Sequence, residues 1–144
     1  MKNQVRNIAI LGLFLIMAVV SVQAQTLSGE VKIPFDFYAG TEKMQAGTYV
    51  VKRMSDNALG IRRVDGKKIA LINAPLTVGA RDSKSGQRVV FNRYGEEFFI
   101  SQIWLTEDSG RQVIPTKQEL RVAKEHREIG VIMPERREIA LIRR

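Results

Sequence analysis

The stretch Arg88–Leu105, RVVFNRYGEEFFISQIWL, decides the fold because it predicts a hairpin that is apolar on both faces. A tight turn at Gly95-Glu96 would pair Phe91 with Ile100. Period-two alternation then gives one face with Val89, Phe91, Phe98, Ile100 and Trp104, and another with Val90, Tyr94, Phe99, Ile103 and Leu105. A strand pair covered on both sides belongs in the middle of a sandwich or a closed barrel.

Two earlier segments predict further strands. The stretch VKIPFDFYAG alternates, so that one face carries Val31, Ile33, Phe35 and Phe37. Pro34 has no N–H to give to a strand ladder, which predicts a sheet edge or a break at that residue. The segment Thr48–Met54 has the β-branched and aromatic content of a second strand.

The stretch GIRRVDGKKIAL predicts another hairpin, the Gly60–Leu71 hairpin, which has two possible registers. A loop of Asp65-Gly66 alone sets Gly60 opposite Leu71, a poor partner for an apolar side chain. A loop of three residues, with Gly66 in the left-handed conformation, segregates the faces instead. We expect the second register, because a one-residue slip inverts every side chain and this register turns inward Leu59, Ile61, Ile69 and Leu71.

The period of the pattern changes near the C-terminus. Thr116 and Glu119 have the spacing of a capping box, which predicts a helix to about Glu128, ended by Gly130. The apolar stripe of this helix is expected along Leu120, Ala123 and Arg127. In the segment 134–144 the sequence is compatible with a short helix that begins at Pro134 and equally with a strand, and both alternatives stay open.

The fold class expected from these segments is all-β. We predict a small antiparallel β-sandwich or partly open barrel of about seven strands, closed by a C-terminal helix. The expected organisation is a signal peptide at residues 1–24, a β-domain with its helix at 25–128 and a C-terminal tail at 129–144.

The segment MKNQVRNIAILGLFLIMAVVSVQAQ predicts a secretory signal peptide. Lys2 and Arg6 precede an apolar run, and Val22-Gln23-Ala24 supplies the small residues of a cleavage site. The apolar run is shorter than the about 20 residues of a membrane-spanning helix. We therefore expect cleavage after Ala24, no transmembrane segment afterwards, and an exported protein that is periplasmic or extracellular.

The net charge limits the kinds of partner that the protein can have, and the absence of cysteine limits how the fold can be stabilised. The full chain carries a net charge of +8, and loss of Lys2 and Arg6 lowers it to +6. Outside the cytoplasm a basic protein meets anionic lipids and polysaccharides rather than nucleic acid. The expected partner is an anionic envelope polymer or another envelope protein, with no nucleic acid. The chain has no cysteine, so no disulfide stabilises it and packed apolar area must do so.

Few residues qualify for catalysis. His126, the only histidine, falls among charged residues of the expected helix, and no Gly-x-Ser-x-Gly elbow accompanies it. One histidine without cysteine does not make a zinc site. Asp36, between Phe35 and Phe37, is the one carboxylate that suits a hydrolase, but alternation turns it outward. We therefore expect no enzyme, no catalytic residue, no metal and no cofactor.

One cluster of cations is a candidate for binding an anion. It combines the Gly60–Leu71 hairpin with the polar loop that follows it, and consists of Arg62, Lys67, Lys68, Arg81, Lys84 and Arg88. The competing interpretation is a solvated hairpin end, because charge runs usually mark wet surface. A second candidate is a ligand groove lined by aromatic side chains, Tyr38, Tyr49, Tyr94 and Trp104, although aromatics at strand spacing are more often core residues.

The spaced set IPFDFYAG, MQAGTYVVKR, LGIRRVDGK, RVVFNRYGEEFFISQIW and GRQVIPTKQELRVA resembles a family of small exported bacterial proteins of unassigned function. The resemblance covers roughly Val31 to Ala123. Gln45 stands where this family commonly has a proline, and Asn92 where it commonly has a histidine. The resemblance implies export, a β-fold and a short C-terminal helix, and it implies no active site.

These observations favour a non-catalytic function. We expect an exported β-domain that serves as a structural or binding module of the cell envelope. The alternative is a basic module that docks on anionic lipid or polysaccharide, and a hydrolase is the third interpretation.

Cleavage after Ala24 is directly testable. Expression of the full chain in a bacterium should give an exported protein that begins at Gln25, as measured by intact mass. Ala24→Leu should block removal of the signal peptide, because the signal peptidase that cleaves it requires a small residue at that position. An exported protein that keeps its first 24 residues would contradict the signal-peptide interpretation.

Overall fold

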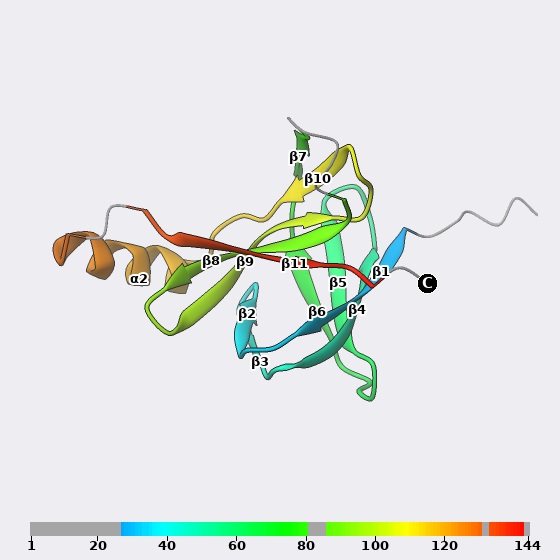
Figure 1. Cartoon of the computed structure of the whole chain (residues 1–144), viewed down its shortest axis with the longest axis horizontal. Helices are drawn as coiled ribbons and strands as arrows, with labels where there is room; N and C mark the ends of the chain where they lie inside the picture. The colour runs from blue at the N-terminus through cyan, green and yellow to red at the C-terminus, as the bar shows by residue number, and fades with distance from the viewer. Residues whose placement is uncertain (1–26, 81–85, 131–132, 143–144) are drawn as a thin grey trace, which may run out of the picture.

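The computed structural model describes residues 27–80, 86–130 and 133–142. In these residues eleven strands form two sheets, with one helix at the end of the molecule (Figure 1). The expected class, an all-β sandwich with a C-terminal helix, is confirmed, and the sheets do not close into a barrel. The strands outnumber the predicted seven because β2, β3, β7 and β10 are only three or four residues long.

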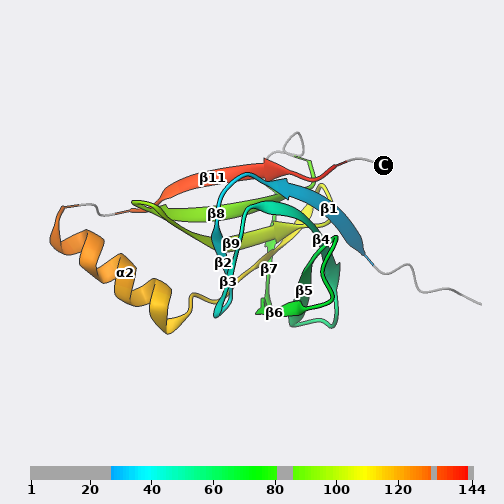
Figure 2. The ribbon, with the colours of Figure 1, turned by 90° about the horizontal axis from the view of Figure 1, so that it is seen from below.

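The first sheet is antiparallel and has the strand order β1 (Ser28–Ile33), β4 (Gly47–Arg53), β5 (Ala58–Arg63) and β6 (Ile69–Asn73). The second sheet has the order β11 (Glu135–Ala140), β8 (Arg88–Tyr94), β9 (Glu97–Trp104), β10 (Ser109–Gln112) and β7 (Leu76–Gly79). The short strands β2 (Phe37–Ala39) and β3 (Glu42–Met44) pair with each other, and β2 adds to β9 in parallel. The helix α2 (Lys117–Glu128) lies away from the first sheet (Figure 2).

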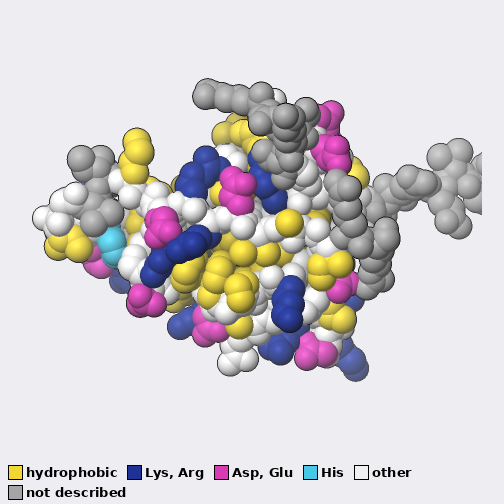
Figure 3. Space-filling model, in the orientation of Figure 1, with side chains coloured by type: hydrophobic (Ala, Val, Ile, Leu, Met, Phe, Trp, Pro, Cys, Tyr) yellow, Lys and Arg dark blue, Asp and Glu magenta, His cyan; other side chains and the backbone are white. Residues whose placement is uncertain are grey.

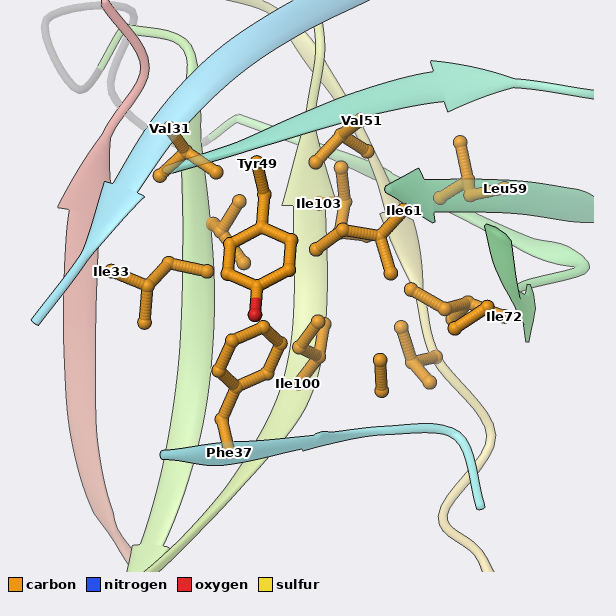
Figure 4. Packing of buried hydrophobic residues seen from close by; sticks show 14 of the residues in the cluster. Val31, Ile33, Phe37, Tyr49, Val51, Leu59, Ile61, Ile72, Ile100 and Ile103 are labelled. Carbon is orange, nitrogen blue, oxygen red and sulfur yellow. The ribbon is translucent and has the colours of Figure 1, made fainter. Parts of the chain in front are cut away.

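The core lies between the two sheets, and aromatic side chains fill its centre. The ring of Phe37 lies edge-on to Tyr49 at 5.2 Å and to Phe91 at 5.6 Å between ring centroids. The labelled aliphatic side chains surround this group from both sheets (Figure 4). Tyr49 is buried and its hydroxyl donates to the carbonyl of Gln45, so this tyrosine belongs to the core and not to a ligand groove.

Pro34 breaks the first strand, as predicted. β1 ends at Ile33, and the chain crosses to the second sheet before β2 begins at Phe37. At the crossing, Phe35 stacks on Phe98 with ring centroids 3.9 Å apart. The alternation of buried residues continues across the break, because Ile33 and Phe37 both face the core.

A β-bulge in the central hairpin changes one part of the prediction. Phe91 pairs with Ile100 as expected, but Val90 pairs with Gln102, which leaves Ser101 as the extra residue. The bulge inverts the alternation beyond it. Ile103, expected on the face opposite Phe91 and Ile100, joins them in the core, and Trp104, expected on their face, points to the other side of the sheet.

The register expected for the Gly60–Leu71 hairpin is wrong. Gly60 pairs with Leu71 and Ile61 with Ala70, so Ala70 and Ile72 are buried while Ile69 and Leu71 are exposed. Gly66 does not adopt a positive φ, and its N–H closes a turn onto the carbonyl of Arg63. The core accepts the small Ala70 opposite Ile61, and Gly60 leaves the outer side open for the displaced apolar side chains.

The C-terminal helix begins and ends as predicted, but a different face packs. The Thr116 hydroxyl accepts the N–H of Glu119 at 3.2 Å, and Gly130 follows the helix with φ of 91°. Leu120 is 54% exposed, whereas Glu119 and Val122 are buried against the sheet. The expected stripe through Leu120 is therefore wrong by one position on the helix surface.

The segment after the helix forms a strand, which decides between the two open alternatives. β11 pairs antiparallel with β8 over its whole length, so this part of the expected tail belongs to the second sheet. The residues after β11 then reach the first sheet: the N–H of Ile142 donates to the carbonyl of Glu30 at 2.7 Å. The Leu141 side chain is buried against Gly29, where a Cβ atom would collide with it.

Gly110 provides a test of how Trp104 packs. A Cβ at Gly110 would lie 2.5 Å from two atoms of the Trp104 ring. Gly110→Ala should therefore lower the free energy of unfolding by about 2 kcal/mol, measured by urea denaturation. Gly79→Ala is the matched control in the neighbouring strand, because a Cβ there has no atom within 4 Å. Equal effects of the two substitutions would contradict the packing of Trp104.

Candidate functional site

The predicted anion-binding residues that the structure describes do not form one site. Arg62, Lys67 and Lys68 lie together at the end of the β5–β6 hairpin. Arg88 lies in the second sheet, where its guanidinium carbon is 4.2 Å from the centre of the Trp104 ring and its Nε is 3.4 Å from Glu138. Arg81 and Lys84 lie outside the described residues. The prediction that all six act together therefore loses Arg88.

Two of the hairpin cations stabilise their own surroundings. Arg62 donates to the Gly66 carbonyl at 2.7 Å and more weakly to two further carbonyls of the loop. Lys68 forms an ion pair of 2.6 Å with Glu42 on β3. Both side chains still contribute positive charge, but their geometry is fixed by the protein itself.

The structure adds two lysines that the sequence analysis did not include. Lys32 of β1 and Lys52 of β4 are exposed and point away from the core, on the side of the first sheet that we call the outer face. Strand pairing aligns this face across the sheet, with Lys52 next to Gly60 and Gly60 next to Leu71. In the described part of the chain the ammonium groups of Lys32, Lys52 and Lys67 make no hydrogen bond or ion pair. The alternation in β1 and β4 was the signal that could have found the first two.

The outer face also carries an apolar group. Leu71 is 66% exposed, Met54 49% and Ile69 48%. A Cβ at Gly60 would be 3.0 Å from Ile69 and 3.2 Å from Met54, so both side chains approach the backbone of β5 where a side chain is missing. Exposed apolar side chains that gather in this way mark an interaction surface more often than single ones do.

Another part of the surface mixes charges of both signs. Figure 3 shows basic and acidic side chains next to each other around a central apolar area. In the second sheet, Arg93 pairs with Glu135 at 3.2 Å and with Glu96 at 3.5 Å. Arg93 is thus compensated by neighbouring acids, whereas no acid pairs with Lys32, Lys52 or Lys67 in the described residues.

A buried polar cluster lies where α2 meets the central hairpin. The Glu119 carboxylate accepts from the Asn92 amide at 2.9 Å and from the Tyr94 hydroxyl at 3.5 Å. Burial raises the pKa of Glu119 above its ordinary value, and these two hydrogen bonds oppose that rise. Burial, with a contribution from Glu119, also raises the pKa of Tyr94. The cluster joins helix to sheet through neutral donors.

The histidine belongs to the same junction. His126 is partly buried, its ring centre 5.7 Å from that of Tyr94, and its Nδ1 lies 3.0 Å from the Val122 carbonyl. Although its neighbours along the helix are charged, it packs against the hairpin turn at Gly95. Its contacts are with the helix backbone and an aromatic ring, which is the pattern of a structural histidine.

Asp36, the candidate acid for a hydrolase, stabilises a turn. Its Oδ1 accepts the N–H of Ala46 at 2.9 Å, and the residue is exposed. Across the described residues, no group of three or more histidine, cysteine or acidic side chains is placed to hold a metal ion. Within the same residues, no helix has both the length and the apolar character needed to cross a membrane.

A cleft of about 230 Å³ opens between the sheets at the end remote from α2. Leu59, Ile103 and Leu105 form its apolar wall, and Arg53 and Arg111 lie at its edge. Both arginines bind the loop at Asp56: Arg53 pairs with the carboxylate at 2.9 Å, and Arg111 donates to the carbonyl. Their donors are thus directed to the chain itself.

No protein-family model matches the chain, and neither curated proteins nor solved structures match it.

Glu119 gives a prediction about pH. Because its pKa is raised in the folded state, ionisation of this group costs stability as the pH rises above its unfolded pKa of about 4.5. Glu119→Gln keeps an acceptor for Asn92 and removes that cost. The variant should gain stability relative to the wild type between pH 4 and pH 8, by about 1 kcal/mol, in urea unfolding at both pH values. A difference that does not change with pH would contradict a buried carboxylate.

Proposed function

We propose that the protein is an exported, non-catalytic binding module of the cell envelope that docks on an anionic surface. The observation that carries the proposal is the outer face of the first sheet, where Lys32 and Lys52 have no acidic partner in the described residues. Lys67, which is also exposed, lies in the β5–β6 loop. An uncompensated group of cations attracts a polyanion from beyond contact distance, within about a Debye length of 8–10 Å.

The wider sequence supports this proposal. Its N-terminal segment has the pattern of a secretory signal peptide, and the remainder of the chain has a net charge of +6. Its resemblance to small exported bacterial proteins points to the same compartment. Anionic lipids and acidic polysaccharides are the polyanions that an exported protein meets there.

Asp36 and His126, the two side chains considered for catalysis, have structural contacts, and so has the buried Glu119. Asp36 is engaged in a turn, and His126 packs on Tyr94. Glu119 is held by Asn92 and Tyr94 at the base of α2. Each group thus has a structural function that accounts for its position.

Charge-neutral variants test the docking. The double variant Lys32→Gln and Lys52→Gln should weaken sedimentation of the mature protein with anionic envelope fractions at low salt by about 25-fold, from about fivefold for each cation. Lys117→Gln with Lys124→Gln is the matched control, because it removes the same charge from exposed positions on α2. The control should have a much smaller effect.

The salt dependence of sedimentation distinguishes electrostatic docking from non-specific adsorption. Wild-type binding should fall between low and physiological salt and should be absent from neutral fractions, because exposed charges are screened. Binding that is independent of salt, or equal loss in the two double variants, would argue against the proposed surface. Failure of the wild type to bind any anionic fraction would remove the proposal.

A further inference from the structure

We infer that the anionic surface is a lipid bilayer, and that the outer face docks on it with Met54, Ile69 and Leu71 entering the interface between head groups and acyl chains. This inference rests on the proposed docking function and specifies its partner. It is carried by the combination, on one face, of uncompensated cations with exposed apolar side chains. A bilayer with anionic head groups offers a matching charge and a matching apolar phase at one boundary.

The three apolar side chains form one patch. Ile69 and Leu71 are two residues apart on β6 and therefore point to the same side. Leu71 pairs across the strands with Gly60, and Met54 lies over the same glycine. Because Gly60 contributes no side chain, Met54 and Ile69 both approach its backbone on the surface of the sheet.

The cations border this patch on the side towards the middle of the sheet. Lys52 pairs with Gly60, and Arg62 pairs with Ile69, so each apolar row of the patch ends in a basic side chain. Long basic side chains keep their charge in water while their stems cover apolar surface. On a bilayer, this arrangement places charge at the phosphate level while the apolar side chains reach below it.

Acidic residues do not cancel the charge of the face. Among the described strand residues of the first sheet, Glu30 is the only acid, against Lys32, Lys52 and Arg62 on the same side. The acids of the adjoining loops lie at the two ends of β5 and pair with core-side arginines, Asp56 with Arg53 and Asp65 with Arg63. The net charge of the face is therefore positive, as a bilayer with anionic lipids requires.

An acidic polysaccharide matches only half of this surface. Its carboxylates would satisfy the lysines, but its hydroxyl groups would leave Leu71 and Ile69 against water. A bilayer removes the same side chains from water, and burial of apolar area adds binding free energy that salt does not screen. The exposed patch therefore favours lipid among the anionic partners of the envelope.

Among the described residues, no element of the fold covers the outer face. Both views of the molecule place α2 at the end away from β4, β5 and β6 (Figures 1 and 2). The second sheet covers the opposite, core side of the first. Docking through the outer face would leave the helix junction and the second sheet in water.

Vesicles of defined lipid test the inference without other envelope components. Mature wild-type protein should sediment with vesicles of phosphatidylcholine and phosphatidylglycerol, and should not sediment with phosphatidylcholine alone. Leu71→Ser should weaken binding to the mixed vesicles by about fivefold, the effect expected when roughly half of a leucine side chain leaves an apolar phase. Ile69→Thr should weaken it in the same direction and keeps the β-branched side chain that suits a strand.

The matched control is Leu120→Ser, which removes a leucine of similar exposure, 54%, from α2. It should leave vesicle binding unchanged. Thermal unfolding of each variant establishes that the fold is kept, as expected for residues that are half exposed. A soluble acidic polysaccharide, polygalacturonate, serves as the second ligand, and Leu71→Ser should leave any binding to it unchanged.

Each result separates the two proposals. Wild-type binding to polygalacturonate but not to vesicles overturns the lipid inference and leaves anionic docking in place. Equal binding of Leu71→Ser and Leu120→Ser to vesicles also overturns it, because charge alone would then account for docking. Binding to neither ligand overturns both proposals and makes a protein partner the next explanation for the exposed patch.

Discussion

The extra residue at Ser101 is the constraint on which the sandwich depends. Without it, the alternation of β9 would turn Trp104 into the core and Ile103 outward. With it, Ile103 packs between the sheets, and Trp104 lies on the other face beneath the Arg88 guanidinium. The Ser101 carbonyl also accepts the N–H of Val113 at 2.8 Å, which draws the chain after β10 towards β9. One inserted residue thus determines both the core and the cover of the second sheet.

Local rules predicted the parts of the fold that depend on local chemistry. Pro34 lacks an N–H and breaks a strand, Thr116 caps a helix, and the turn at Gly95 pairs Phe91 with Ile100. The bulge had no such signal, because Ser101 reads as an ordinary polar position of the strand. The β5–β6 register depended on the space at Gly60, which alternation alone does not describe.

The candidate site shows the same division. The run of cations in Gly60–Leu71 was visible in the sequence, but Arg62 and Lys68 turn out to bind the loop carbonyls and Glu42. The lysines that remain without acidic partners in the described residues include Lys32 and Lys52, which lie outside that run along the chain. Sheet pairing, and not sequence density, brings charge and exposed apolar side chains together, so a charge run is a poor guide to where a β-protein binds.

The pairing of Ile142 with Glu30 has a consequence for how this chain folds. The first strand is completed on one side by β4 and on the other by a residue more than a hundred positions later, and Leu141 fills the space beside Gly29. Contacts of such long sequence separation form late and slowly. A chain that becomes available from its N-terminus onwards therefore leaves this edge of β1 unpaired until residues 135–142 are available. Such delayed closure would suit the export that we propose, because a polypeptide must remain unfolded while it is transported.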